Sequence, residues 1–425
     1  MLAIRALASP SRGKLECLRA APAQSWARSL PRRPALAACD IAACAVSSFI
    51  AFGSTAMRVR TSMLSLAALT SSMVLGGMPC AVAAATIEPA VINSAITASP
   101  VLKPSGRAEL PGYSGDFDHF AADVTGNRLF LAGEDEGTLE VFDLRTCTHL
   151  KTIKGFEHPH GILYLPDVKR LIVTDSGAGM TKVVDAVSYG IIGSIALNAG
   201  ADSMYYDASR EHLYVVTGGK NAEPKMSRSI ISEIDPRTGE RIGELSFDTD
   251  FTESMVAEQR GQRLFVNLTG KSTIAVLDKT NRRVIDSWPI KGAELNAAMA
   301  FDETHQRLFV STRKPFKLLV LDARTGAALA DFVAPQRTNQ VMFDKANQRI
   351  YVAGDDYISV IQQQDENHYE EVARVPTATG AKTAILVPEL RQLYVAVSPG
   401  KTKAGGALLR FDVVPDPLIR PVAKN

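Results

Sequence analysis

One four-residue pattern occurs seven times in this chain of 425 residues and limits the folds available to it. Each copy has a basic or polar residue, an aliphatic residue, an aromatic or aliphatic residue, and a further aliphatic residue. The first aliphatic residue of each copy is Leu129, Leu171, Leu213, Leu264, Leu308, Ile350 and Leu393. These positions are 42, 42, 51, 44, 42 and 43 residues apart. A repeat of about forty residues made of short β-strands is typical of the blades of a β-propeller.

Each repeat is expected to form four strands. In the fourth repeat, runs of β-branched and aromatic residues between turn residues predict strands at 254–257, 263–268, 272–277 and 284–290. An Asp follows the third strand of most repeats, for example Asp235, and we expect its side chain to cap backbone N–H groups of the next turn. The predicted fold class is all-β, with four-stranded blades.

The ends of the repeat region predict how the ring closes. The last repeat ends after its third strand, near Asp412, and residues 107–110 lie where a fourth strand would precede the first repeat. We predict that this N-terminal strand completes the last blade of a seven-bladed ring, because closure removes an exposed sheet edge. We expect a monomeric propeller at 107–414, after a flexible tether at 86–106 and before a C-terminal tail at 415–425.

Residues 57–85 have the composition of a secretory signal peptide. Arg58 and Arg60 precede a mostly apolar run at 63–78, and small residues follow it, which is the order of a cleaved signal. We therefore expect a periplasmic or extracellular protein without a membrane span after cleavage. We expect the preceding residues, 1–56, to be a non-native or disordered extension. Four of the five cysteines lie before residue 86, so no internal disulfide is expected.

The charge of the chain argues against a nucleic-acid partner. The whole chain has a net charge of +2, but residues 1–85 hold nine Lys and Arg against two acidic residues. The remainder has 38 basic and 43 acidic residues, a net charge of −5. Proteins that bind nucleic acids are usually basic or carry a dense basic stripe. We expect instead a small polar ligand or a protein of the cell envelope.

Two repeats are longer than the others, and both grow between their second and third strands. The third repeat gains residues 218–229, and the seventh gains residues 399–407. In a propeller these loops share a face with the starts of the inner strands, and long loops on a rigid scaffold often carry binding sites. We expect function at the mouth of the central channel on this face.

Polar side chains stand at most starts of the inner strands. The candidate ligand-binding residues of this face are Asp118, His160, Asp202, Glu253, Asn296, Asn339, Lys382 and Arg313. A channel mouth in contact with water is polar in any case, so the pattern also has a purely structural explanation. A ligand site is the sharper explanation, because carboxylates, amides and a histidine at one funnel suit a hydrophilic ligand or a cation.

Two kinds of ligand fit these residues equally well. A divalent cation such as calcium takes oxygen ligands, and the candidate metal ligands are Asp118, Asp202 and Glu253. Lys382 and Arg313 would suit an anionic organic ligand.

His160 and His119 are the candidate catalytic residues, because histidine exchanges protons near neutral pH. A structural role in the loop is an equal alternative, and whether the protein is an enzyme stays open.

The repeats resemble those of the YVTN/YncE-like family of secreted bacterial β-propellers. The resemblance covers the predicted propeller and is carried by the repeats that contain Tyr214, Tyr351 and Tyr394. Residues 115–120 and 159–161 are similar to a YncE-like subgroup in which these starts of inner strands recur. The family implies a periplasmic or extracellular propeller, mostly without an established reaction.

Three functions are compatible with these observations. The first is a secreted propeller that binds a small polar ligand or a protein partner at the mouth of its channel. The alternative is a divalent-metal-dependent lactonase or related hydrolase of the gluconolactonase type, in which His160 or His119 would handle protons. The third is an interaction module of the cell envelope without a small-molecule site.

Overall fold

The computed structural model describes residues 101–177 and 180–415. The predicted N-terminal extension, the predicted signal peptide, most of the tether and most of the tail lie outside the described residues. Within the described ranges, no helix has the length and the apolar character needed to cross a membrane.

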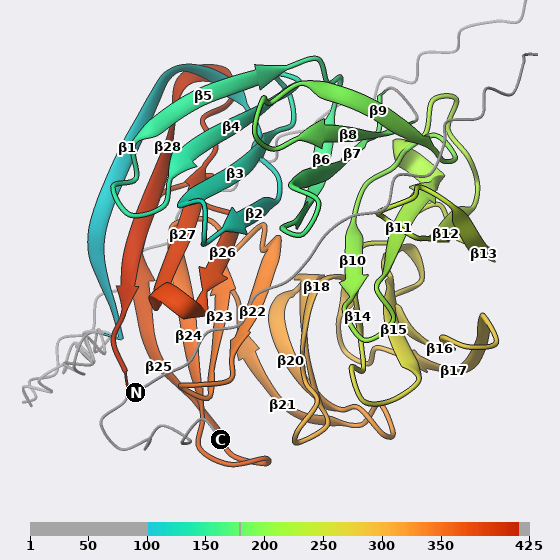
Figure 1. Cartoon of the computed structure of the whole chain (residues 1–425). Coiled ribbons are helices and arrows are strands. Elements are labelled where there is room, and N and C mark those ends of the chain that lie inside the picture. Colours follow the sequence, from blue (N-terminus) through green and yellow to red (C-terminus); the bar gives the residue numbers. More distant parts are fainter. Residues whose placement is uncertain (1–100, 178–179, 416–425) are drawn as a thin grey trace, which may run out of the picture. The chain divides into compact units, whose positions relative to one another are not determined.

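The described residues form seven four-stranded antiparallel sheets, which are the blades of a propeller (Figure 1). Blade 1 comprises β2 (Phe120–Asp123), β3 (Arg128–Gly133), β4 (Thr138–Asp143) and β5 (His149–Lys154). Blade 2 comprises β6 (Pro159–Leu165), β7 (Arg170–Asp175), β8 (Met180–Asp185) and β9 (Ile191–Ala196). Blade 3 comprises β10 (Met204–Asp207), β11 (His212–Gly218), β12 (Ser229–Ile234) and β13 (Arg241–Phe247). Blade 4 comprises β14 (Met255–Ala257), β15 (Arg263–Leu268), β16 (Thr273–Asp278) and β17 (Arg283–Pro289).

The remaining blades have the same order. Blade 5 comprises β18 (Glu294–Asp302), β19 (Arg307–Lys314), β20 (Phe316–Asp322) and β21 (Ala328–Val333). Blade 6 comprises β22 (Gln340–Asp344), β23 (Arg349–Ala353), β24 (Tyr357–Gln363) and β25 (Tyr369–Pro376). Blade 7 comprises β26 (Thr383–Val387), β27 (Gln392–Val397), β28 (Gly400–Val413) and β1 (Leu102–Gly115). Three single-turn helices complete the described part: η1 (Gly219–Asn221), η2 (Thr269–Lys271) and η3 (Pro388–Leu390). The predicted all-β, seven-bladed propeller is confirmed.

The N-terminal strand closes the ring. β1 pairs antiparallel with β28, with Arg107 opposite Leu409, so the predicted closure is confirmed. The strand starts earlier than the expected boundary at 107, because Leu102 already pairs with Val413 at the end of β28. Residues 102–106 therefore belong to the propeller and not to the tether.

The recurring pattern forms the second strand of every blade and packs against both neighbouring blades. Side chains alternate between the two faces of a strand, so the third residue of a copy faces one neighbour and the second and fourth residues face the other. Phe130 of β3 packs with Leu171 of β7, and the equivalent contact recurs at the other interfaces. The series ends with Tyr394 of β27 against Leu129 of β3. The first aliphatic residue of each copy is at most 1% exposed, and such burial contributes about 1.5–3 kcal/mol per side chain.

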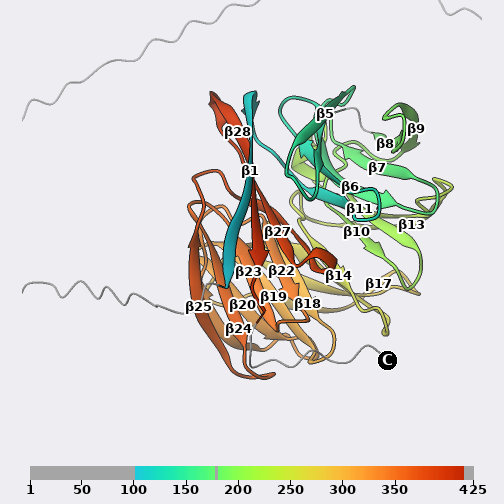
Figure 2. The ribbon, with the colours of Figure 1, turned by 60° about the vertical axis from the view of Figure 1, so that its left-hand side comes forward.

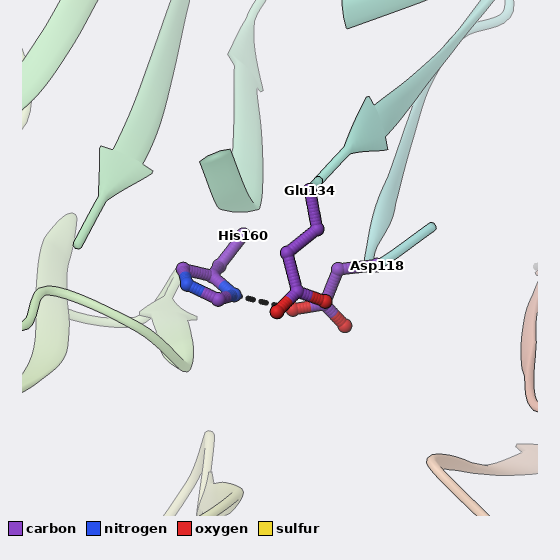
Figure 3. Close-up of side chains that lie close together, drawn as sticks. All are labelled: Asp118, Glu134 and His160. Atoms are coloured by element: carbon purple, nitrogen blue, oxygen red, sulfur yellow. Dashed lines mark hydrogen bonds and ion pairs between the residues drawn. The ribbon is translucent and has the colours of Figure 1, made fainter. Parts of the chain in front are cut away.

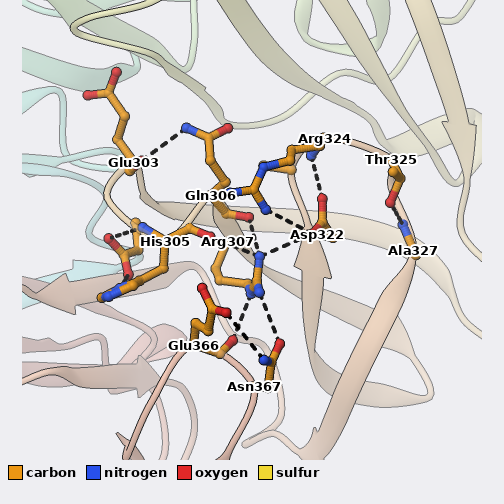
Figure 4. Close-up of polar contacts among 12 residues, drawn as sticks. Glu303, His305, Gln306, Arg307, Asp322, Arg324, Thr325, Ala327, Glu366 and Asn367 are labelled. Carbon is orange, nitrogen blue, oxygen red and sulfur yellow. Dashed lines mark hydrogen bonds and ion pairs between the residues drawn. The ribbon is translucent and has the colours of Figure 1, made fainter.

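In five of the seven copies, the first residue of the pattern is an arginine that connects its blade to the next. His212 and Gln392 instead bond within their own blades. Arg307 of β19 donates from Nε to the backbone oxygen of Glu366 at 2.7 Å and from Nη2 to Oδ1 of Asn367 at 3.0 Å, both in the turn before β25 (Figure 4). Arg170 and Arg349 likewise donate to backbone oxygens of the blade that follows. Arginine predominates at this position because a guanidinium can satisfy several carbonyl groups at once.

The aspartates after the third strands cap the next turn, as predicted. Oδ1 of Asp235 accepts hydrogen bonds from the backbone N–H groups of Arg237 and Thr238 at 2.7 and 3.3 Å. Asp185 and Asp278 make equivalent pairs of bonds. These carboxylates therefore have a structural role.

The two predicted insertions differ in structure. Residues 218–229 include the loop between β11 and β12, which contains η1. In blade 7, most of residues 399–407 continue β28 instead of forming a loop, and this extension pairs with β1 as far as Gly115 opposite Gly400. The two strands project together past their neighbours (Figure 2). The expected loop of blade 7 is a two-stranded extension because β1 provides a pairing partner at its edge.

Candidate functional site

Side chains at the starts of the inner strands meet at one mouth of the channel. His160, near the start of β6, is at the centre of this group. Its Nδ1 is 2.8 Å from Oδ2 of Asp118, which precedes β2, and its Nε2 is 2.9 Å from Oγ of Ser176, which follows β7. Oδ1 of Asp202, which precedes β10, is 3.6 Å from the same Nδ1. His160 therefore connects three consecutive blades.

The neighbouring carboxylates hold His160 in its charged form. Burial alone would lower the pKa of the imidazole, but the carboxylates of Asp202 and Asp118 outweigh this effect and raise the pKa to about 10. Burial would raise the pKa of Asp118, but His119, His160 and Lys382 outweigh it, so the pKa of this carboxyl lies well below its usual range. At neutral pH the pair is an imidazolium and a carboxylate.

Glu134 is one of the residues of this site that were not predicted from the sequence. It follows β3, and its carboxylate lies beside Asp118 and His160 (Figure 3). A potential ligand atom of each of these three residues lies within 4.8 Å of the other two. Burial and the carboxylate of Asp118 raise the pKa of Glu134 to about 7. The three side chains therefore lie around one small space, which two carboxyl groups and one imidazole line.

The repeat contains a signal that would have located Glu134. It stands five positions beyond Leu129, and the same offset in blades 2 and 5 gives Ser176 and Arg313, which both contact residues of the mouth. Asp175 precedes Ser176 and has another task, because its carboxylate accepts hydrogen bonds from two backbone N–H groups of the loop before β6. The position five residues after the first aliphatic residue of a copy, rather than the residue type, therefore indicates which side chains lie at the mouth.

The long loop of blade 3 contributes two further side chains. Nδ2 of Asn221 donates to Oδ2 of Asp202 at 2.6 Å. The ammonium group of Lys220 lies 3.1 Å from the centre of the Phe251 ring, and burial lowers the pKa of this lysine. The loop therefore fixes one carboxylate of the mouth and adds a positive charge to it.

A second branch of polar contacts runs through blades 4, 5 and 6. Nη1 of Arg313, in β19, is 3.0 Å from Oε1 of Glu253, and Nη2 is 3.5 Å from Oδ1 of Asn339. Nδ2 of Asn339 donates to Oδ1 of Asp118 at 2.9 Å. Burial raises the pKa of Glu253, although Arg313 opposes the shift. Six blades thus contribute to one polar chain, in the order Asp202, His160, Asp118, Asn339, Arg313 and Glu253.

Lys382 and His119 lie beside this chain. Nζ of Lys382 is 2.8 Å from Oδ2 of Asp116, so its charge is paired. Nε2 of His119 is 3.6 Å from Oδ1 of Asp118, which exceeds a hydrogen-bond distance. Neither side chain shares the space between Asp118 and His160.

Asn296 is not part of the mouth. Its side chain is fully buried, and Nδ2 donates to Oδ1 of Asn267 at 2.6 Å and to the backbone oxygen of Thr273 at 3.0 Å. The pairing of β18 with β19 shifts register between Asn296 and Met299. Such an irregularity changes the direction of a side chain, so Asn296 packs between blades 4 and 5.

Two cavities lie along the inner strands, away from the polar chain. One cavity of about 640 Å³ is lined by inner-strand residues that include Tyr205, Met299 and Phe301. A second cavity, of about 300 Å³, includes His119 and Phe120 in its lining. The polar chain lies where the inner strands start, whereas these cavities follow the inner strands and carry many apolar side chains.

The distances around His160 match those of a nucleophile, a base and an orienting carboxylate, with Ser176, His160 and Asp118 in that order. A general base must be neutral to accept a proton, and the carboxylates keep His160 charged at neutral pH. Ser176 therefore has no available base. The arrangement is better suited to binding positive charge than to acyl transfer.

Comparisons with known proteins support the fold alone. No family model matches the chain, and no curated protein matches it. A chain of the solved structure described as "Crystal Structure of Mitotic Checkpoint Complex" is 14% identical, with a TM-score of 0.59 over 82% of this chain and 100% of that chain. A chain of hydrazine synthase from Kuenenia stuttgartiensis is 14% identical, with a TM-score of 0.60 over 72% of this chain and 97% of that chain. One fold hosts many functions, so these structures establish a β-propeller, and the resemblance to the YncE-like family stays a prediction.

Proposed function

We propose that this protein is an exported binding protein whose channel mouth takes a small polar ligand. The observation that carries the proposal is the polar chain of Asp202, His160, Asp118, Asn339, Arg313 and Glu253, to which six blades contribute. Charged side chains on a rigid scaffold, with a long loop beside them, are typical of a ligand site.

The charges of the mouth define the chemistry of the ligand. Glu134 and Lys220 have polar groups for which the described residues provide no hydrogen-bond partner. Glu134 and Asp202 form an acidic side, and Lys220 and Arg313 form a basic side. A ligand with an anionic group would face the basic side, and a cation or a cationic group would face the acidic side.

Thermal unfolding of the purified full chain tests this proposal. The probes are a panel of amino acids, sugar acids and polyamines, which differ in charge. We expect a compound that raises the melting temperature of the unmodified protein and loses its effect in Lys220→Gln and Asp202→Asn. Lys271→Gln is the matched control, because Lys271 lies in the equivalent loop of blade 4. The absence of any shift, or equal shifts in all variants, would contradict the proposal.

Export to the periplasm or beyond is part of the proposal and is supported by the composition of residues 57–85. Fractionation of bacteria that express the full chain should place the protein outside the cytoplasm, with an N-terminus close to residue 86. A cytoplasmic protein that retains residues 57–85 would contradict export.

A metal-dependent hydrolase, such as a lactonase, is the second candidate. One observation favours it, the grouping of Asp118, Glu134 and His160, because a bound metal ion can polarise a carbonyl group or activate water. A lactone panel with and without zinc tests this activity. Metal-dependent turnover that is lost in Glu134→Gln would support the hydrolase. The absence of turnover would contradict the hydrolase and leave the binding function as the proposal.

A further inference from the structure

We propose that Asp118, Glu134 and His160 bind one divalent transition metal ion, for which zinc is the best match. The proposal assigns an occupant to the acidic side of the mouth and to that extent rests on the proposed function. From the sequence, Asp118, Asp202 and Glu253 were candidate ligands of a divalent cation such as calcium, but Glu253 is paired with Arg313 at 3.0 Å.

The distances suit one small ion. Nitrogen and oxygen ligands lie about 2.0–2.2 Å from zinc, so two ligands of the same ion are at most about 4.4 Å apart. The ligand atoms of the three residues lie within 4.8 Å of one another, and shifts of a few tenths of an ångström bring them into range. Asp118 and Glu134 flank β2 and β3 of one blade, and His160 is in β6 of the next, so rigid strands hold all three.

The surrounding contacts orient the ligands. Oγ of Ser176 binds Nε2 of His160, and Nδ2 of Asn339 binds Oδ1 of Asp118. The remaining atoms, Nδ1 and Oδ2, face each other at 2.8 Å. Histidines and carboxylates that bind metals are usually fixed in this way through their outer atoms. A metal ion would replace the proton between Nδ1 and Oδ2.

The chemistry of the donors selects the metal. Imidazole nitrogen suits zinc and other transition metals, whereas calcium takes six to eight oxygen ligands. Asp202 is a further donor near the site, because its Oδ1 is 3.6 Å from Nδ1 of His160 and its other oxygen is held by Asn221. Two carboxylates and one imidazole therefore surround the position, and the carboxylate of Asp202 lies next to the imidazole.

Calorimetric titration of the full chain, after removal of metals with a chelator, tests the site. The probes are the chlorides of zinc, manganese and calcium. We expect one zinc ion per chain with a Kd in the micromolar range or below, and weaker binding of calcium. Glu134→Gln should weaken zinc binding at least tenfold. Glu136→Gln is the matched control, because this exposed carboxylate lies two positions away and binds Ser114, and it should leave the Kd unchanged.

Glu134→Gln is the decisive variant because its side chain accepts no hydrogen bond from the described residues and glutamine keeps its size, so we expect the variant to fold. Circular dichroism of both variants checks this. No stoichiometric zinc, tighter calcium than zinc, or equal zinc affinity of the two variants would overturn the proposal. If the protein binds no zinc but a compound of the ligand panel still raises its melting temperature, only the metal site is contradicted. If the protein binds zinc but no compound of the panel shifts its melting temperature, only the small-ligand function is contradicted.

Discussion

Arg313 and Glu253 form an ion pair between blades 5 and 4, with Nη1 of the guanidinium 3.0 Å from Oε1 of the carboxylate. Burial raises the pKa of Glu253 and Arg313 opposes that shift, so the carboxylate depends on its partner. We predict that Arg313→Gln lowers the free energy of unfolding by about 1–3 kcal/mol, since a largely buried charge loses its partner. Urea unfolding at pH 7 measures the loss.

The double variant Arg313→Gln/Glu253→Gln is the control for this prediction. It removes both charges and should lose less stability than Arg313→Gln alone. A double variant that simply adds the two single losses would show that the two side chains do not interact in solution.

A second ion pair is fully buried between blades 3 and 4. Nζ of Lys279 is 2.7 Å from Oδ2 of Asp207, and the two side chains are 1% and 0% exposed. We predict that Lys279→Met costs about 3–5 kcal/mol, because it leaves a buried carboxylate without its partner. Replacement of both residues by apolar ones, Lys279→Met/Asp207→Leu, should cost less. Urea unfolding of the two variants checks the order, and equal losses would contradict it.

Closure of the ring by β1 predicts a large effect at the N-terminal strand. Leu110 is 8% exposed and packs with Leu129 and Leu408. We predict that Leu110→Ala costs about 2–5 kcal/mol through lost burial and the cavity it leaves. Lys103→Ala, at an exposed position of the same strand, should change stability by less than about 0.5 kcal/mol. Equal effects of the two substitutions would mean that the strand does not close the ring in solution.

The fold is well predicted from the sequence because the same packing arrangement recurs in every blade. The alternation of side chains across each second strand places Phe130 and its equivalents against the next blade, so a pattern of four residues specifies the ring. The closing strand is predictable too, because the last repeat ends after its third strand. Its full length is not, because the start at Leu102 depends on pairing with Val413, more than three hundred positions away.

The candidate site is less predictable because position along the repeat does not fix side-chain direction. The expected starts of the inner strands located Asp118 and His160, which meet at 2.8 Å. Asn296 was expected at the mouth because it lies near the start of an inner strand, whereas a register shift in β18 leaves it buried between blades. Glu134 was overlooked because acidic residues after strands are common, and its residue type gave no reason to compare its offset from Leu129 with that of Ser176 or Arg313.

The aspartates that cap the turns predict how stability depends on pH. A backbone hydrogen bond from Ser188 lowers the pKa of Asp185, and the side-chain hydrogen bond from Asn281 lowers the pKa of Asp278. A folded-state pKa below the unfolded value means that the unfolded chain binds more protons in acid. The stability from these carboxylates is therefore present above about pH 4 and is lost as the pH falls through the lowered pKa.

Substitution by asparagine separates the hydrogen bond from the charge, because the amide oxygen still accepts the backbone N–H groups but does not titrate. We predict that Asp185→Asn/Asp278→Asn reduces the slope of the unfolding free energy against pH between about pH 4 and 2, with little change at pH 7. Asp185→Ala/Asp278→Ala should be less stable at pH 7 as well, since alanine removes the cap. Urea unfolding across this range measures both effects. An unchanged acid slope in the asparagine variant would mean that these carboxylates keep ordinary pKa values in the folded protein.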